Sequence, residues 1–346
     1  MKNQTWLSKI MHFLNIVLVV VTILAYVLPF LAPKLFPFLS VFSLVLPFLL
    51  ILNFLFFVYW LLQLKKYMFI SGIVLLLGIT FINKLYKFSE TNIPESENDF
   101  VIMSYNVRLF NLYEWLPKKD VPKEINKFVA QENPDILCIQ EFSPVDAINF
   151  SQYKYNYINV EGKKNKYGQA IYSKFKIINK GEIEFPHSSN KVIYADVLRK
   201  KDTIRVYSMH MQSVKISTDI NDNIDEEKSK FIFKRISEAF TEQQLQAELI
   251  KKNVDACKLP KIICGDMNNS AFSYVYRLIK NDLKDAFEEA GTGFGKSYNF
   301  KYYPARIDYL LVEKEFEVKQ YQSFDAFFNS DHFPLSTRLE LKKKDN

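Results

Sequence analysis

Residues 261–269 have the sequence KIICGDMNN, in which a short apolar strand runs directly into Asp266 and Asn268. A carboxylate and an amide in this position either form a turn that ends the strand or belong to a site at the edge of a sheet. What stands at the ends of the other strands separates these two explanations.

Polar side chains capable of catalysis stand at the ends of most other predicted strands. Taken singly, each has an ordinary explanation, because a Glu after a strand is usually solvated, an Asn can cap a turn and a buried His can be a satisfied core residue. Taken together, they predict side chains that converge at one edge of paired sheets. The set comprises Asn106, Glu141, His210, Asp266, Asn268, Asp308, Asp331 and His332.

Strands and helices alternate irregularly along residues 100–346, a length typical of one domain. Short runs of β-branched and aromatic residues predict the strands, and apolar residues at helical spacing predict the helices. Strands are expected over 100–107, 135–140, 169–173, 192–198, 203–210, 261–264, 306–312 and 335–341. Helices are expected over 123–132, 228–255 and 274–280.

The order of the polar residues resembles that of the endonuclease/exonuclease/phosphatase superfamily, which includes deoxyribonuclease I, exonuclease III and the sphingomyelinases. The segments that show the resemblance are SYNV, PDILCIQE, YGQAIYS, GDMNN, RIDYLLV and SDHFPL, and together they span residues 100–341. The resemblance implies an α/β (α+β) fold, a four-layer sandwich of two mixed β-sheets flanked by helices, with the site at one end.

The resemblance also implies a divalent metal ion, Mg²⁺ or Mn²⁺. Glu141 would be its main ligand, Asn106 would help to hold the metal and the attacking water, and Asp331 would support a metal. The chemistry makes the same demand, because a hard cation with oxygen ligands neutralises an anionic phosphodiester and lowers the pKa of bound water.

The remaining residues would carry out the reaction. By resemblance, Asp266 would orient or deprotonate the attacking water, and Asn268 and His210 would donate to the phosphate oxygens. His332 would protonate the leaving oxygen or stabilise the pentacovalent transition state, with Asp308 orienting it. Phosphodiester hydrolysis requires side chains such as Asp and His that transfer protons. It also requires hydrogen-bond donors held in place where negative charge develops.

One position departs from a branch of the family, and the charge distribution is uneven. Arg108 stands where apurinic endonucleases usually have an acidic residue, which argues against abasic-site repair. Residues 1–89 contain seven Lys and no Arg, Asp or Glu, so the net charge of +7 belongs to this part and the rest has 38 basic and 38 acidic residues. A part without net positive charge is not built for tight non-specific binding to nucleic acid. The three Cys match no zinc site or disulfide framework.

The N-terminal quarter predicts a membrane region at residues 1–87 with about three helices, over 11–31, 39–62 and 67–83. The alternative for the first stretch, a cleaved signal peptide, fits less well because its apolar run is long and others follow. The third stretch has only 17 uncharged residues between two lysines, at the short limit for a span. Residues 88–99 are polar, acidic and interrupted by a proline, which predicts a linker to a catalytic domain at 100–346.

The location of the catalytic domain follows from the number of spans. Three spans and a slight excess of lysine on the N-terminal side predict a multi-pass protein of a bacterial cytoplasmic membrane, with the catalytic domain on the periplasmic or outer face. If the third stretch does not span, the domain returns to the cytoplasm.

The sequence therefore predicts a membrane-anchored, divalent-metal-dependent phosphoesterase, with nuclease activity as the default. The substrate would be a phosphodiester of nucleic acid or of a phospholipid headgroup, and no obligate protein partner is expected. One alternative is a phospholipid or inositol-phosphate phosphoesterase. A second alternative, from a different class, is a catalytically inactive membrane interaction module, against which the intact set of site residues argues.

Overall fold

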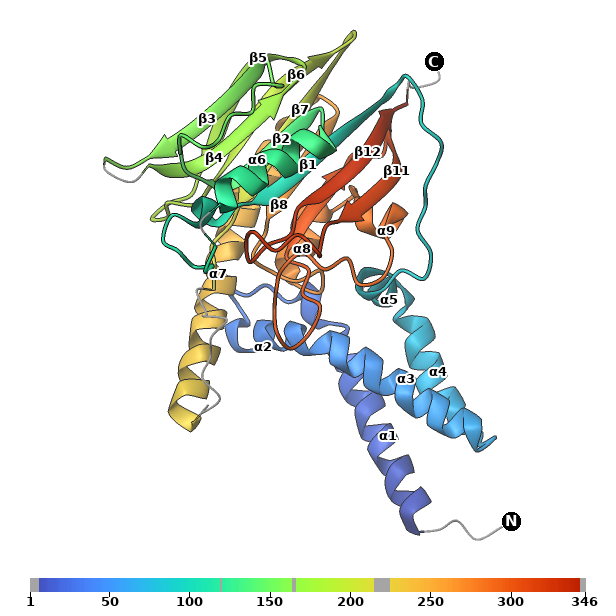
Figure 1. Cartoon of the computed structure of the whole chain (residues 1–346). Helices are drawn as coiled ribbons and strands as arrows, with labels where there is room; N and C mark the ends of the chain where they lie inside the picture. The colour runs from blue at the N-terminus through green and yellow to red at the C-terminus, as the bar shows by residue number, and fades with distance from the viewer. Residues whose placement is uncertain (1–5, 119, 164–165, 215–224, 343–346) are drawn as a thin grey trace.

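The computed structural model describes residues 6–342 apart from 119, 164–165 and 215–224. Two six-stranded mixed sheets pack face to face (Figure 1). The first has the order β11 (Phe316–Ser323), β12 (Leu335–Leu341), β1 (Asp99–Asn106), β2 (Ile136–Phe142), β4 (Tyr167–Ser173), β3 (Tyr155–Glu161). The second has the order β5 (Lys176–Glu184), β6 (Lys191–Arg199), β7 (Asp202–His210), β8 (Lys261–Asp266), β10 (Asp308–Val312), β9 (Lys284–Asp285).

The main core lies between the two sheets. Alternate residues of the central strands point inward, among them Ile102, Cys138, Val206 and Leu310, and each is fully buried. Cys138 and Cys264 are free thiols in this core, where a thiol acts as a small apolar group. The inward alternation explains why these strands read as β-branched runs.

Helices cover the outer face of each sheet and complete four layers. Helix α6 packs on the first sheet through Ile125 and Val129. The second sheet is covered through Ile250 and Val275, which lie on α7 and α8. A further short helix, α9, lies beside β11 (Figure 1). The four helices are α6 (Val121–Glu132), α7 (Glu226–Ala256), α8 (Tyr274–Lys280) and α9 (Ala286–Ala290). The predicted four-layer sandwich is confirmed.

The N-terminal region is helical and apolar on its outside. Two of its helical segments, Trp6–Phe30 and Pro37–Leu62, are long and apolar enough to cross a membrane. Its elements are α1 (Trp6–Ala25), η1 (Leu28–Phe30), α2 (Pro37–Val41), η2 (Phe42–Val45), α3 (Leu46–Leu62), α4 (Met68–Leu77) and α5 (Ile79–Leu85).

The third apolar stretch is not one straight helix over 67–83. Helices α4 and α5 meet at Gly78 with a bend of 74°, so the pair is a third span only if both parts are counted together. The hydroxyl of Tyr26 lies where a side chain at Gly78 would stand, 2.1 Å from an ideal Cβ. Glycine therefore allows α1 to approach α4 closely at the break.

Polar groups of the N-terminal helices are buried between them. Asn15 Nδ2 donates to Ser71 Oγ at 2.6 Å, and Trp60 Nε1 donates to Asn15 Oδ1 at 2.9 Å. Asn53 Nδ2 donates to Thr22 Oγ1 at 2.8 Å. Asn15 and Asn53 therefore serve helix contacts, as expected for scattered polar residues in such helices.

The helical region docks against one end of the sandwich (Figure 1). Phe272, which follows the GDMNN stretch by three residues, packs in one apolar cluster with Ala25, Leu50 and Phe81. Residues 86–98 then run along the side of the sandwich, where Ile93 N donates to Lys319 O at 3.0 Å. The end that receives the helices is the end where β1 and β8 finish.

Candidate active site

The predicted site residues converge because of strand direction. β1 and β2 are parallel, as are β7 and β8, so each pair brings its carboxyl ends to the same edge. The antiparallel strand β10 begins at that edge. Asp266 at the end of β8 therefore has Asp308 of β10 as its neighbour on one side and His210 of β7 on the other. Packing of the two sheets joins both edges into one polar site.

Asp266 lies at the centre of this site and is almost fully buried. Its Oδ2 accepts from Asn106 Nδ2 at 3.1 Å and from Asn268 Nδ2 at 3.0 Å. Its Oδ1 accepts from the backbone N–H of Asn268 at 2.8 Å. The loop is possible because Gly265 has φ +123° and a Cβ there would stand 2.1 Å from Met209 O, a conformation and a space that glycine alone tolerates.

Burial raises the pKa of Asp266 to about 8, with the positive charge of His332 opposing and the nearby Asp308 and Glu141 adding to the rise. A carboxyl in apolar surroundings beside other carboxylates resists ionisation, since each neighbouring negative charge disfavours another. A pKa shifted this far is typical of a functional site.

Glu141 leaves the regular ladder at a β-bulge. The register of β2 against β4 shifts between Gln140 and Phe142, and Glu141 has φ +50°. Bulges re-aim single side chains and are common beside active sites. Glu141 Oε1 accepts from Asn106 Nδ2 at 3.2 Å and lies 3.6 Å from His210 Nε2. Asn106 thus connects Glu141 with Asp266.

Asp308 and His332 form a buried pair. The His332 Nδ1 to Asp308 Oδ2 distance is 2.9 Å, and His332 Nε2 lies 3.7 Å from Asp266 Oδ2. Burial works against a charged imidazole here, yet Asp308 and Asp266 raise the pKa of His332 well above its usual value. The neighbouring carboxylates thus favour the protonated form of the His332 ring, and Asp308 fixes its orientation through Nδ1.

His210, the other histidine of the site, lies in an environment that shifts its pKa in the opposite direction. Its Nε2 lies 3.8 Å from Asp266 Oδ2. Burial lowers the pKa of His210, with Glu141 opposing. The pKa values of the two histidines thus shift in opposite directions, since His332 has a carboxylate hydrogen-bonded to its ring.

Asp331 lies at the rim of the site. Its Oδ2 is 3.0 Å from Arg108 Nη1, and the Arg108 guanidinium stacks over the ring of Trp115 at 4.4 Å. Ser330 Oγ joins this rim to the centre, donating to Asn106 O at 2.9 Å. The structure thus joins seven of the eight predicted residues in one connected set of contacts. The eighth, Asp331, lies at the rim, where its ion-pair partner is Arg108.

Sequence reasoning missed the polar ladder beneath the site. Gln140 Nε2 donates to Ser208 Oγ at 2.9 Å, and Ser208 Oγ donates to Gln169 Oε1 at 2.9 Å. These buried groups hold β2, β4 and β7 together under Glu141. The glutamines in CIQE and YGQA are a usable signal, because an uncharged polar residue in an apolar strand needs a partner.

A second missed feature is the turn of α7 behind the GDMNN loop. Gln243 Nε2 donates to Gln212 O at 2.6 Å and to Asn268 O at 3.0 Å, while its Oε1 accepts from Asn269 Nδ2 at 2.6 Å. Gln243 is fully buried. It fixes the loop that carries Asp266 against the exit of β7 after His210.

The donor set fits a hard divalent cation. Carboxylate oxygens of Glu141 and Asp266 lie on either side of Asn106 Nδ2, which donates to both, and carboxylate oxygens suit Mg²⁺ or Mn²⁺. Asp266, Asp308 and His332 also offer ligand atoms within 4.8 Å of one another. In this group Nδ1 of His332 is already hydrogen-bonded to Asp308, which leaves Nε2 facing Asp266.

Comparison with known proteins gives a family for this part of the chain. Residues 103–332 match the model of the Endonuclease/Exonuclease/phosphatase family, and this range is more than half of the chain. The chain belongs to that family. The family membership predicted from the sequence is thus confirmed. Members of this family such as the exoribonuclease Ccr4 are enzymes that hydrolyse phosphodiester bonds. Residues 8–85 match a domain of unknown function.

Individual relatives of this endonuclease/exonuclease/phosphatase family protein are distant. The chain is 23% identical to the CCR4-Not complex 3′-5′-exoribonuclease subunit Ccr4 of Candida albicans in an alignment 332 positions long that covers 72% of this chain. The alignment spans 42% of the length of that relative.

Solved structures show the same fold. An endonuclease/exonuclease/phosphatase from Bacteroides vulgatus matches with a TM-score of 0.54 and 18% identity, covering 71% of this chain and all of the other. D. rerio TDP2 complexed with single-strand DNA product matches with a TM-score of 0.52 and 16% identity, covering 70% of this chain and all of the other.

Proposed function

We propose that this protein is a membrane-anchored, divalent-metal-dependent phosphodiester hydrolase. The observation that supports it most strongly is the buried contact set around Asp266. Asp266 Oδ2 lies 3.7 Å from His332 Nε2, and Nδ1 of the same ring lies 2.9 Å from Asp308 Oδ2. A carboxyl group and an imidazole in contact are the groups that general acid–base catalysis uses.

The metal would be held by Glu141, with Asn106 beside it and Asp331 in support. When bound, Mg²⁺ or Mn²⁺ supplies positive charge that neutralises the phosphodiester and favours ionisation of a bound water. The recess beside Glu141 and His210 also contains Asn190 and Lys191. It gives room for the part of a substrate that adjoins the phosphate.

The chain's own residues divide the remaining work. Asp266 takes a proton from the attacking water, and His332 gives a proton to the leaving oxygen while Asp308 holds its ring. Asn268 and the neutral His210 donate hydrogen bonds to non-bridging oxygens. Without substrate, Asn268 Nδ2 donates to Met211 O and to Asp266 Oδ2, so one of these two hydrogen bonds must give way when Asn268 donates to a phosphate oxygen.

The first substrate class is nucleic acid. Support comes from the exoribonuclease activity in the name of the Candida albicans relative and from the DNA product bound to D. rerio TDP2. A second class, a phospholipid headgroup, is supported by the contact of the apolar helices with the site end of the sandwich through Phe272.

The proposed location is a bacterial cytoplasmic membrane, with a domain of residues 100–346 on the outer face. Residues 1–87 form the anchor and residues 88–99 the link between them. The support is two helices that are long and apolar enough to span and a bent pair that gives a third. An odd number of spans places the two ends of the region on opposite sides.

The test is a substrate panel with the full chain in detergent micelles. Single- and double-stranded DNA, RNA, phospholipids and bis-p-nitrophenyl phosphate are incubated with Mg²⁺ or Mn²⁺ and with EDTA. We expect turnover of at least one phosphodiester that EDTA abolishes and added metal restores. Turnover that resists EDTA contradicts the metal proposal, and a folded protein without turnover on any substrate favours the inactive interaction module.

A further inference from the structure

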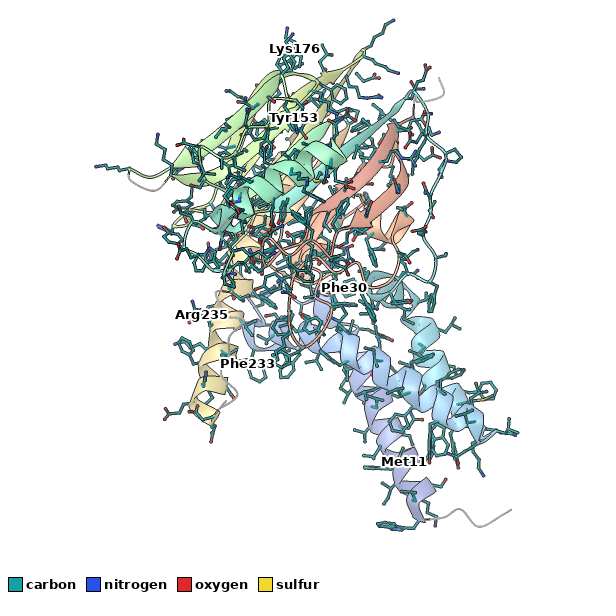
Figure 2. The ribbon with its side chains drawn as sticks, in the orientation of Figure 1. Met11, Phe30, Tyr153, Lys176, Phe233 and Arg235 are labelled. Carbon is teal, nitrogen blue, oxygen red and sulfur yellow. The ribbon has the colours of Figure 1, made fainter. Side chains whose placement is uncertain are left out.

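Helix α7 is longer than the face that it covers. From Ala239 onward it contributes buried residues to the domain, whereas none of residues 226–238 is buried. Figure 1 shows this first half, here called the projecting half (226–238), extending past the sandwich on the side of the N-terminal helices. Phe233 and Arg235 lie on it in Figure 2.

The projecting half packs on residues 31–45, here called the connector, which join α1 to α3 and include the first turns of the candidate span Pro37–Leu62. Phe233 contacts Phe38 of α2, with ring centroids 4.9 Å apart, and Phe42 of η2, at 5.9 Å. A connector between two spans lies where they leave the bilayer. Any element packed side by side with α2 therefore lies at the same surface.

Large apolar side chains remain exposed on these two elements. Phe231 of the projecting half is 59% exposed, and on the connector Phe38 is 60% and Leu35 is 75% exposed. Phe36 and Leu39 add to the same connector. Exposed apolar side chains gathered in this way mark an interaction surface.

The charges of the projecting half favour a lipid interface over a nucleic acid. Residues 226–238 hold four basic and three acidic residues, and two of the lysines are paired within the helix, Lys230 with Glu226 and Lys234 with Glu238. Phosphate backbones are bound by unpaired basic clusters. Phe233 faces α2, whereas Phe231, two positions earlier, lies on the opposite, exposed side of the helix among the paired charges. A phenylalanine among charged residues on a helix surface is compatible with the headgroup layer of a bilayer.

We propose that the projecting half of α7 and the connector together rest on the headgroup layer of the bilayer, which is their binding partner. This inference depends on the membrane anchoring in the proposed function. It adds that the catalytic domain itself contacts the bilayer through α7.

One turn of α7 links this surface to the site. On one side, Gln243 holds the loop of Asn268, and Gln246 Oε1 accepts from Gln212 N at 2.8 Å. On the other side, Gln244 Oε1 accepts from the backbone N–H of Lys34 at 2.9 Å in the connector. The same rigid helix thus holds the catalytic loop and sits on the bilayer, which fixes the height of the site above the membrane.

The test measures the depth of single probes in the full chain. Cys138 and Cys264 are buried, so a Cys257→Ser background leaves little native labelling. Phe231→Cys, Val20→Cys in α1 and Ile178→Cys on β5 are labelled with an environment-sensitive fluorophore. The proteins are reconstituted in phosphatidylcholine–phosphatidylglycerol vesicles with and without phosphatidylcholine that bears a spin label high on the acyl chain.

We expect spin-labelled lipid to quench the probes at 231 and 20 to about half their intensity, since interfacial helices bury their apolar side among the upper acyl chains. The probe at 178 should keep its intensity. Lys230→Cys provides a second probe on the projecting half if Phe231→Cys does not fold.

Three results overturn the proposal. Quenching at 20 but not at 231 removes the projecting half from the bilayer and leaves the anchoring intact. Loss of quenching at both positions removes the anchoring itself. A blue-shifted but unquenched probe at 231 means that a protein surface, from this chain or from a second copy, covers the helix.

Discussion

The helical region and the sandwich bury opposite kinds of side chain. In the helical region the outside is apolar, with Val20 and Leu24 among its exposed residues, and polar groups such as Asn15 are enclosed. In the sandwich the space between the sheets is apolar, and buried polar groups such as Asn106 gather at one end.

The difference shows that a buried asparagine has no fixed meaning. Asn15 has neutral partners, Ser71 and Trp60, and its hydrogen bonds join helices. Asn106 donates to two carboxylates, Glu141 and Asp266, and so holds together groups that repel each other. Satisfied neutral networks specify packing, whereas charge held together against repulsion is typical of functional sites.

The largest expected effect is on turnover at the site end. Asp266→Asn keeps the shape of the side chain but removes the proton acceptor, and turnover should fall by about 10²- to 10⁴-fold, the range of general acid–base contributions. His332→Ala should lower turnover by a similar factor. Asp308→Asn should lower turnover less, because Asp308 only orients His332. The measurement is steady-state turnover of a panel substrate.

Folding should survive Asp266→Asn with a lower melting temperature, because an amide nitrogen in place of Oδ2 cannot accept from Asn106 Nδ2 and Asn268 Nδ2. The matched control is Asp282→Asn, whose side chain is 79% exposed and which should leave turnover unchanged. Near-normal turnover in folded Asp266→Asn would remove the proposed base.

A second prediction concerns a buried ion pair of the sandwich outside the proposed catalytic set. Asp285 Oδ2 accepts from Arg306 Nη1 at 2.6 Å and from Tyr276 Oη at 2.7 Å. Asp285→Asn leaves the buried guanidinium without its counter-charge, and apparent stability should fall by about 3–5 kcal/mol. Thermal unfolding in detergent measures it.

The double variant Asp285→Asn/Arg306→Met should recover most of that loss, because an apolar side chain replaces the stranded charge. If Asp285→Asn alone is as stable as the parent, the pair contributes nothing and the contrast with the helical region is weaker.

The smallest effect is expected in the helical network. Asn53→Leu removes hydrogen bonds to Thr22 Oγ1 and Leu49 O, and such bonds between apolar helices contribute only about 0.6 kcal/mol on average. Apparent stability should therefore change by less than about 1 kcal/mol, and turnover should not change. Asn15→Leu should lower apparent stability more than Asn53→Leu does, since it leaves the indole N–H of Trp60 unpaired. A large loss of turnover in Asn53→Leu would contradict a purely structural role.

The central strands and the site residues could be predicted because burial on both faces leaves continuous apolar runs that end in polar residues. The edge strands β3 and β5 were missed for the same physical reason, whereas β11 was missed although half of its residues are buried. β3 and β5 alternate exposed and half-buried residues, as in KIINKGEIE at 176–184, so their pattern resembles a polar loop.

Other features depend on contacts that no local pattern contains. The helix over 67–83 breaks at Gly78 because Tyr26 from a distant helix fills the space beside it. Gln243 gains its role only when α7 packs behind the GDMNN loop. Likewise, the pairing of Arg108 with Asp331 joins residues more than 200 positions apart.

The most direct test of the account is metal titration of Glu141→Gln beside Glu317→Gln, a surface glutamate paired with Lys342. With the full chain in detergent, turnover is measured against Mg²⁺ and Mn²⁺ concentration after removal of metal by EDTA. We predict that Glu141→Gln needs at least about tenfold more metal for half-maximal turnover, because a charged oxygen ligand is lost and divalent cations depend on such ligands. Glu317→Gln should follow the parent curve. A Glu141→Gln protein that is folded and has the parent's metal dependence would contradict the central claim that this end of the sandwich is a metal-dependent phosphodiesterase site.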